Sequence, residues 1–355
     1  MNSKLSTLIW RITPSAFLFF FLQVSLRAQT AVPPSAPSQP VTREVTDDMG
    51  RTIRIPVTPM RIVSLAPSST ETLYALNLQE RLVGDTDFCD YPAAAKEKAK
   101  VGGPINPSLE QIAALHPDLV LVTKSVNRLE TVNALQTLGI PSYAQNARTM
   151  EEIIASTQKL AELLGAGESG RVLGDNLRAR LDVLRAKMVG VAPTRVLFVV
   201  WTEPLMSIGQ QTFIADVLRK AGAISIVDSQ QDWPRVSLEE VARLQPEYLV
   251  TTETPHTGSG SHGLEDLVEL PGWRLLQAVQ NRRFAVVNDV VTRPSPRIIV
   301  AAEELAHRLH PEAFQEKIDP RKDTLQKSSS MKKGPECCLI TAMQTPENLE
   351  WSCAR

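Results

Sequence analysis

The sequence has few aromatic residues, few cysteines and almost no net charge. Aromatic side chains make up 5% of the 355 residues, and the formal net charge is −1. Lysine and arginine form no block or stripe, so a nucleic-acid-binding role has no electrostatic basis. Of the four cysteines only Cys89 lies outside the C-terminal tail, and we therefore predict no disulfide framework.

Common enzyme motifs are missing as well. The sequence has no Gly-x-x-x-x-Gly-Lys-Ser/Thr, no Gly-x-Ser-x-Gly and no His-Glu-x-x-His. Residues 258–263 match the dinucleotide pattern Gly-x-Gly-x-x-Gly, but four residues separate them from the preceding predicted strand, so the tight turn is lost. We interpret them as a polar loop. A nucleotide-dependent α/β enzyme that uses this loop is the alternative from another functional class.

Three other residues have the chemistry for metal binding or catalysis. His256 and His262 lie in the same loop but lack a third clustered ligand at the usual spacing. A nucleophilic Cys89 needs a nearby base that the sequence does not reveal, and we interpret this residue as a small buried hydrophobe. Contact of any of the three with the metal of a bound ligand stays open.

The two ends of the chain differ from its middle. Lys4 and Arg11 precede the apolar run 16–26, which is shorter than the roughly 20 residues needed to span a bilayer. We predict a signal peptide and export to the periplasm, with an uncleaved anchor as the alternative. The tail has no sustained periodicity and is predicted to be disordered; a disulfide or metal site among its cysteines is the alternative. The predicted segments are a signal peptide, 1–28, a Pro-, Ser- and Ala-rich linker, 29–40, and a disordered tail, 319–355.

One phrase occurs twice. Residues 108–121 are Ser-Leu-Glu-Gln-Ile-Ala-Ala-Leu-His-Pro-Asp-Leu-Val-Leu, and residues 237–250 are Ser-Leu-Glu-Glu-Val-Ala-Arg-Leu-Gln-Pro-Glu-Tyr-Leu-Val. In each copy the serine caps a short helix, and Gln111 or Glu240 reaches back to its N–H as in a capping box. A proline ends the helix, and the following apolar run is typical of a buried parallel strand. Two such units indicate an α/β protein with two similar lobes.

The rest of the middle continues this pattern. We predict a hairpin that turns at Gly50 and a helix that begins with a capping box made by Ser68 and Glu71. A longer helix begins near Glu168, with leucines at three- and four-residue steps; it is either a strut between the lobes or a helix packed within one of them. Predicted strands are 61–66, 82–84, 119–122, 195–200, 248–252 and 283–287; other predicted helices include 127–138, 150–164 and 213–221. The predicted division is an N-terminal lobe, 41–165, an interlobe helix, 166–190, and a C-terminal lobe, 191–318.

Three motifs, together with the repeat, carry a family resemblance. They are Asp-Tyr-Pro at 90–92, Trp-Pro-Arg-Val-Ser-Leu-Glu at 233–239, and Ser-Pro-Arg-Ile-Ile-Val-Ala-Ala-Glu-Glu at 295–304. From about residue 43 to 314 the chain resembles the periplasmic binding proteins of vitamin B12, haem and ferric-siderophore ABC importers, most closely the cobalamin-binding members. The resemblance implies two α/β lobes, each a mostly parallel sheet flanked by helices, joined by one long rigid backbone helix. It also implies a ligand cleft between the lobes and no catalytic activity.

Aromatic residues that line the pocket in this family correspond to Phe88 and Trp233. Tyr91 lies in the same loop as Phe88, and Trp201 is a further candidate by its position after a predicted strand. Flat aromatic faces bury a large macrocycle mainly through apolar contact. Many cobalamin binders have another aromatic residue after Val-Gly-Gly, where this chain has Pro104.

The resemblance further implies ligand and partner classes. We expect cobalamin or a related corrinoid, with haem or a ferric siderophore as the alternative, and no intrinsic cofactor. Arg293 and Arg297 either meet anionic groups of the ligand or pair within their own lobe. In this family one surface glutamate on each lobe docks against arginines of the permease dimer, and these positions correspond to Glu110 and Glu239. The alternative is that both only complement a helix N-terminus. We expect the chain to be a monomer.

Overall fold

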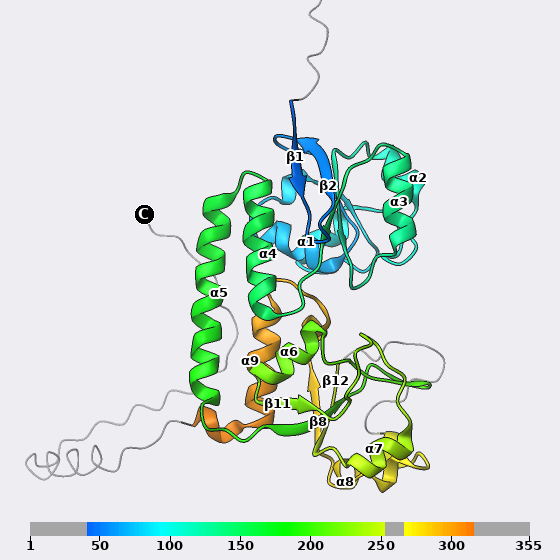
Figure 1. The fold of residues 1–355 in the computed structure, drawn as a ribbon, viewed down its shortest axis with the longest axis vertical. Coiled ribbons are helices and arrows are strands. Elements are labelled where there is room, and N and C mark those ends of the chain that lie inside the picture. Colours follow the sequence, from blue (N-terminus) through cyan, green and yellow to red (C-terminus); the bar gives the residue numbers. More distant parts are fainter. Residues whose placement is uncertain (1–40, 253–265, 316–355) are drawn as a thin grey trace, which may run out of the picture. The chain divides into compact units, whose positions relative to one another are not determined.

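A computed structural model describes residues 41–252 and 266–315, and the structural statements below concern these residues (Figure 1). The chain divides into the units Met1–Thr42 and Arg43–Arg355, and only Val41 and Thr42 of the first are described. The predicted signal peptide, linker and tail lie outside the described residues, as does the loop with His256 and His262. No helix in the described ranges is long and apolar enough to cross a membrane.

Two parallel sheets form the centres of the two lobes. Their strand orders are β5-β4-β3-β6-β7 and β11-β8-β12-β13, and every neighbouring pair in them is parallel. In each sheet the first strand in sequence lies inside, and the chain then crosses to both sides of it, as in doubly wound folds. The N-terminal sheet contains β3 (Ile62–Ser64), β4 (Leu82–Asp85), β5 (Ala99–Lys100), β6 (Leu119–Thr123) and β7 (Ser142–Gln145). The C-terminal sheet contains β8 (Thr194–Phe198), β11 (Ala223–Ser225), β12 (Tyr248–Thr252) and β13 (Phe284–Val287).

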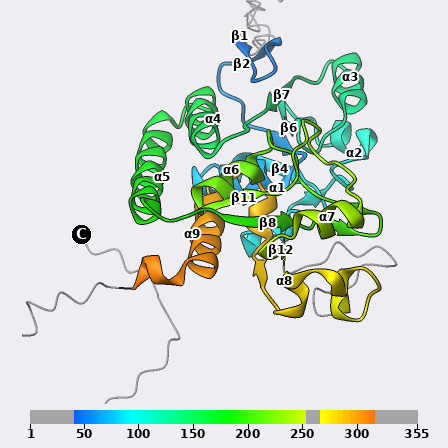
Figure 2. The same cartoon turned by 60° about the horizontal axis from the view of Figure 1, so that its bottom comes forward.

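Each sheet is buried on both faces, which explains the continuous apolar runs of its strands. In β6, Leu119 and Leu121 pack in one hydrophobic cluster, while Val120 and Val122 pack in another on the opposite face. Strand β8 alternates in the same way between two clusters of the C-terminal lobe. In that lobe α6 (Phe213–Lys220) and α9 (Ile298–Leu309) cover one face, and α7 (Leu238–Leu244) and α8 (Gln277–Gln280) cover the other (Figure 2).

Two long helices run side by side along one side of the two lobes (Figure 1). They are α4 (Met150–Leu163) and α5 (Gly167–Met188), the latter with 22 residues. The first turns of α4 place Ile153 and Ile154 in the core of the C-terminal lobe, and its last turns place Leu160 and Leu163 in that of the N-terminal lobe. In α5, Leu173 packs against both cores. The long helix is thus a strut between the lobes rather than a part of one lobe.

The two copies of the repeat have the same local structure. The Oγ atoms of Ser108 and Ser237 accept hydrogen bonds of 3.2 and 3.1 Å from the N–H groups of Gln111 and Glu240, as predicted. The second predicted hydrogen bond of the capping box, from the N–H of Ser108 to the side chain of Gln111, is wrong in the first copy. The N–H of Ser108 donates instead to the carbonyl of Val101. In each copy a helix leads through a residue with positive φ and a proline to a central strand. The helices are α2 (Leu109–Ala114) and α7.

The other predicted capping box is wrong. Helix α1 (Pro67–Ala75) begins at Pro67, and its N-cap residue Ala66 makes no side-chain cap. A proline is favoured in the first turn because its missing N–H is not needed there. Ser68 therefore lies inside the helix, and the side chain of Glu71 bonds elsewhere. Strands β5, β7 and β11 were not predicted; the remaining elements are the hairpin strands β1 (Thr42–Thr46), β2 (Thr52–Pro56), β9 (Trp201–Thr202) and β10 (Leu205–Met206), and helix α3 (Leu129–Thr137).

Candidate functional site

The sheet topology indicates where a ligand binds. In open α/β sheets ligands bind beyond the carboxyl ends of the strands, at the point where the strand order reverses. In the N-terminal sheet this point lies between β3 and β6, and in the C-terminal sheet it lies between β8 and β12. Lys124 follows β6 directly, and Trp201 begins the hairpin after β8. The loops after these strands are therefore the candidate site.

A small hollow of about 30 Å³ lies between the lobes, lined by residues that follow β6, β7, β10 and β11. Arg148, from the loop after β7, reaches across the boundary: its Nη1 is 3.2 Å from Oε1 of Gln211 and 3.8 Å from Oδ1 of Asp232. Lys124 is exposed and forms no ion pair with any described residue. The hollow thus combines an aromatic face with cations. Its walls are formed by Lys124, Ser125, Asn146, Ala147, Arg148, Gln211, Thr212, Phe213, Asp232 and Trp233.

The loop after β4 carries two predicted aromatic residues on a buried base. Phe88 and Tyr91 are 62% and 47% exposed, whereas Cys89 between them is buried. The Sγ atom of Cys89 lies 3.2 Å from the hydroxyl oxygens of Thr70 and Thr86, and burial raises the pKa of its thiol. A protonated, enclosed thiol is a poor nucleophile, which agrees with the interpretation of Cys89 as a small buried hydrophobe.

Lys100 ties this loop to the sheet. Its Nζ lies 2.7 Å from Oδ1 of Asp85, at the end of β4, and 3.0 Å from the carbonyl oxygen of Ala95. The carboxylate of Asp85 is fully buried, and burial raises its pKa against the opposing effect of Lys100. A buried carboxylate needs such a partner, since an unpaired one is strongly destabilising.

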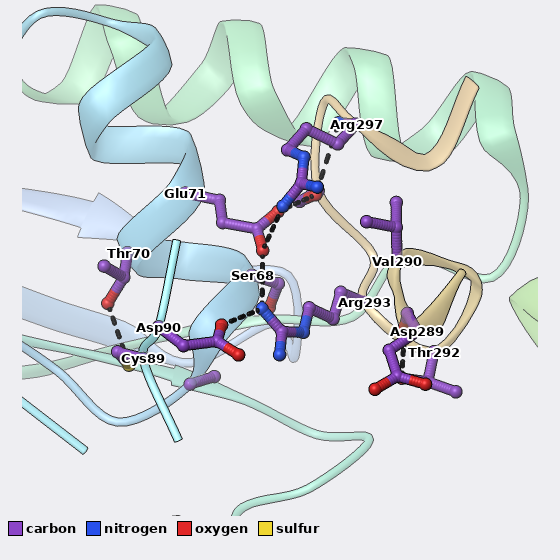
Figure 3. A network of polar contacts seen from close by, with 12 residues as sticks. Ser68, Thr70, Glu71, Cys89, Asp90, Asp289, Val290, Thr292, Arg293 and Arg297 are labelled. Carbon is purple, nitrogen blue, oxygen red and sulfur yellow. Dashed lines mark hydrogen bonds and ion pairs between the residues drawn. The ribbon is translucent and has the colours of Figure 1, made fainter. Parts of the chain in front are cut away.

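The two predicted arginines bind carboxylates of the opposite lobe (Figure 3). Arg293 Nη1 lies 2.9 Å from Oε1 of Glu71 and 2.6 Å from Oδ1 of Asp90. Arg297 Nη1 lies 3.2 Å from the same oxygen of Glu71, and its guanidinium is 3.4 Å from the centre of the Tyr91 ring. Pairing within their own lobe, one of the two predicted alternatives, is therefore wrong, because α1 directs Glu71 across the boundary.

The hydrogen bonds and charges of this network shift the pKa values of Asp90 and Arg293. The hydrogen bond from Arg293 holds the pKa of the Asp90 carboxyl below its usual value. Burial alone would lower the pKa of Arg293, but its hydrogen bonds to Asp90 and Glu71 outweigh burial and raise it. Asp90 and Arg293 are consequently both charged at neutral pH, so their contact across the boundary is an ion pair.

The structure brings some of the predicted ligand residues together and separates others. Tyr91, Arg293 and Arg297 line one hollow of about 230 Å³, while Trp233 lines the smaller hollow beside Lys124. The walls of these two hollows include neither Phe88 nor Trp201. In the β9–β10 hairpin, Nε1 of Trp201 donates to the carbonyl of Glu203 at 2.7 Å.

Sequence reasoning missed the polar residues of the smaller hollow. Lys124 and Arg148 were not singled out, although both follow strands of the N-terminal sheet. Their positions after β6 and β7 were the available signal, and β7 itself was not predicted. Glu71 was misread as a helix cap, and no local pattern identified its real partners.

The two glutamates of the repeat lie on the surface. Glu110 and Glu239 are exposed in the first turns of α2 and α7. Neither side chain forms an ion pair or a hydrogen bond with another described residue, whereas the neighbouring Glu240 lies 3.6 Å from Arg243. Both carboxylates are thus available to a partner.

Two other observations concern where a metal ion or a ligand could bind. The described residues contain no group of three or more histidine, cysteine or acidic side chains that could hold a metal ion. A hollow of about 680 Å³ lies between α5 and α9, away from the carboxyl ends of the strands. The loops between the lobes remain the candidate ligand site.

Comparison with known proteins agrees with this arrangement. An uncharacterised ABC transporter substrate-binding lipoprotein of Bacillus subtilis is 31% identical over 285 residues, covering 78% of this chain and 88% of that protein. The crystal structure of a periplasmic vitamin B12-binding protein of Vibrio cholerae is 29% identical, with a TM-score of 0.63, and the match covers 74% and 100% of the two chains. A periplasmic haem-binding protein in complex with two haems is 25% identical, with a TM-score of 0.65, and the match covers 73% and 100%.

The family model described as periplasmic binding protein matches residues 62–290, more than half of the chain. The resemblance read from the three sequence motifs is thereby confirmed. The nucleotide-dependent enzyme is ruled out as an alternative, since the relatives and the fold are those of binding proteins. With two doubly wound lobes and its candidate site in the loops between them, the chain belongs to the periplasmic binding protein family.

Proposed function

We propose that this chain is the exported substrate-binding protein of an ABC importer, which captures cobalamin or a related corrinoid and delivers it to the permease. The observation that carries the proposal is the position of Trp233 beside Lys124 and Arg148, at the carboxyl ends of the strands of two opposed lobes. An aromatic face with nearby cations suits a flat macrocycle that bears a phosphate. Similarity to the vitamin B12-binding protein of Vibrio cholerae supports the corrinoid.

Haem is the second candidate within the same class. Its support is the similarity to a periplasmic haem-binding protein, at 25% identity. Haem carries two carboxylates, which Lys124 and Arg148 suit as well as they suit a phosphate. Anionic groups of a ferric siderophore could meet the same two cations, so it is the third ligand to test.

A side-by-side titration distinguishes the candidates. The purified protein is titrated with cobalamin, haem and a ferric siderophore, and binding is followed by calorimetry and tryptophan fluorescence. We expect cobalamin to bind more tightly than about 10 μM, or about −7 kcal/mol. Trp233→Ala should weaken binding at least tenfold, while Leu275→Ala, at an exposed apolar residue outside the hollow, should not. If none of the three ligands binds, the proposal is wrong.

Docking to the permease is tested through the repeat. We propose that Glu110 and Glu239 bind arginines of the permease dimer, one glutamate on each lobe. The double variant Glu110→Ala with Glu239→Ala should keep its ligand affinity but lose at least tenfold in affinity for the purified cognate permease in lipid nanodiscs. The matched control replaces Glu130 and Glu269, which are also exposed, one on each lobe; Glu130 also lies in a first helical turn. Equal losses in both double variants would contradict specific docking.

A further inference from the structure

Glu71 is buried at the boundary between the lobes. Only 1% of its side chain is exposed, and a lone carboxylate in such surroundings would be costly. In addition to the two guanidinium contacts, Ser295 donates its hydroxyl to Oε2 at 2.6 Å. All three donors belong to one segment, between a 3₁₀ turn and α9 of the C-terminal lobe. This segment of the C-terminal lobe therefore contacts the N-terminal lobe through Glu71 (Figure 3).

The charges of the network balance only when Glu71 is present. Two carboxylates, Glu71 and Asp90, face two guanidiniums, Arg293 and Arg297, and each ion pair crosses the lobe boundary. Asp90 is about half-exposed, so Glu71 is the only buried anion of the network. Its removal leaves two neighbouring guanidiniums that repel each other, of which only Arg293 keeps a carboxylate partner among the described residues, the half-exposed Asp90.

The same arginines fix the loop that carries Tyr91. Arg297 lies over one face of the ring, and Arg293 bonds to the residue just before it. Glu71 in turn binds both guanidiniums that hold the loop. The orientation of Tyr91 thus depends on a carboxylate in α1.

We propose that Glu71 is a positioning residue of the ligand site: a buried latch that joins the two lobes and fixes Tyr91 through Arg293 and Arg297. The effect on ligand affinity rests on the proposed function. The effect on the ligand-free protein does not, because the latch contacts are made between protein side chains alone.

Hydrogen–deuterium exchange of the full, ligand-free chain tests the latch directly. Glu71→Gln keeps the size of the side chain and removes its charge. We expect segments 86–92 and 288–297, which belong to different lobes, to exchange at least tenfold faster, while the sheets keep their protection. Glu303→Gln is the matched control: Glu303 pairs with Arg180 at 2.5 Å between α5 and α9, outside this network. Unchanged exchange in either segment of Glu71→Gln would overturn the latch.

Ligand affinity tests the positioning role. With the ligand that binds best among cobalamin, haem and the ferric siderophore, Glu71→Gln should bind at least tenfold more weakly, or about 1.4 kcal/mol, and Glu303→Gln should match the unaltered protein. Faster exchange with unchanged affinity would overturn the positioning role. If the unaltered protein binds none of the three ligands, the proposed function fails, while the exchange result still decides the latch.

A second variant covers the case in which Glu71→Gln does not fold. Arg297→Lys keeps the positive charge but loses the planar guanidinium that lies over Tyr91. It should speed exchange in segment 86–92 and weaken ligand binding. Exchange and affinity equal to those of the unaltered protein would overturn the proposal.

Discussion

Replacing Lys100 by methionine should destabilise the protein in a pH-dependent way. The ammonium of Lys100 lies 2.7 Å from the carboxylate of Asp85, whose side chain is fully buried, while that of Lys100 is 30% exposed. At this distance and an effective dielectric constant of about 20, the attraction is about 6 kcal/mol. Removing one partner of a buried pair typically costs about 3–5 kcal/mol. Because Lys100 is partly exposed, we expect a loss of about 3 kcal/mol at pH near 7.5.

The direction of the pH dependence follows from Asp85. Burial raises the pKa of its carboxyl, and the hydrogen bond and charge of Lys100 oppose that rise. A raised pKa in the folded state means that stability is lost as the pH rises through it. Without Lys100 the pKa rises further, so the loss is largest at neutral pH and declines on acidification.

Urea unfolding at several pH values measures both effects. Lys100→Met should lose stability at pH near 7.5 and approach the unaltered protein at pH near 4.5, and Asp85→Asn with Lys100→Met should recover most of the loss. Lys96→Met, at an exposed lysine of the same region, is the control. A loss that is the same at both pH values would refute the reasoning, since it would reflect packing of the lysine stem rather than an unpaired carboxylate.

Two further predictions concern close packing and burial. Gly209→Ala should lower the free energy of unfolding by about 1–3 kcal/mol and weaken ligand binding, because the added Cβ would overlap the backbone carbonyl of Gln231, two residues before Trp233. Urea unfolding measures the stability and calorimetry measures the binding. Gly103→Ala, where a Cβ has room, should change neither quantity. In an ultraviolet absorbance titration one tyrosine should ionise near pH 12, and Tyr143→Phe should remove that step, because burial, with the nearby Asp48, raises the pKa of Tyr143 to about 12. A step that persists in Tyr143→Phe would contradict this assignment.

The periodic parts of the fold could be predicted from the sequence. The repeat identified α2, β6, α7 and β12, because helix caps, apolar spacing and prolines act locally. Short edge strands such as β5 and β11, with two and three residues, were missed because they offer too few residues for a pattern. The division of the chain at residues 165 and 190 stays a prediction.

The candidate site was predictable only in part. Family motifs led to Tyr91, Arg293 and Arg297, which the structure places around one hollow. The role of Glu71 was hidden, because its partners lie more than 220 residues away in the sequence and its local pattern matched a capping box. Which ligand these residues meet stays a prediction.

The path of α4 through both hydrophobic cores has a consequence for how the protein melts. Ile153 and Leu160 lie on one helix but in the cores of different lobes. Unfolding the C-terminal lobe would therefore expose apolar surface that also anchors the N-terminal lobe, and neither lobe has a complete interior without this helix. Cooperative unfolding follows such shared cores. We therefore expect the two lobes to unfold together, although they are built on two separate sheets.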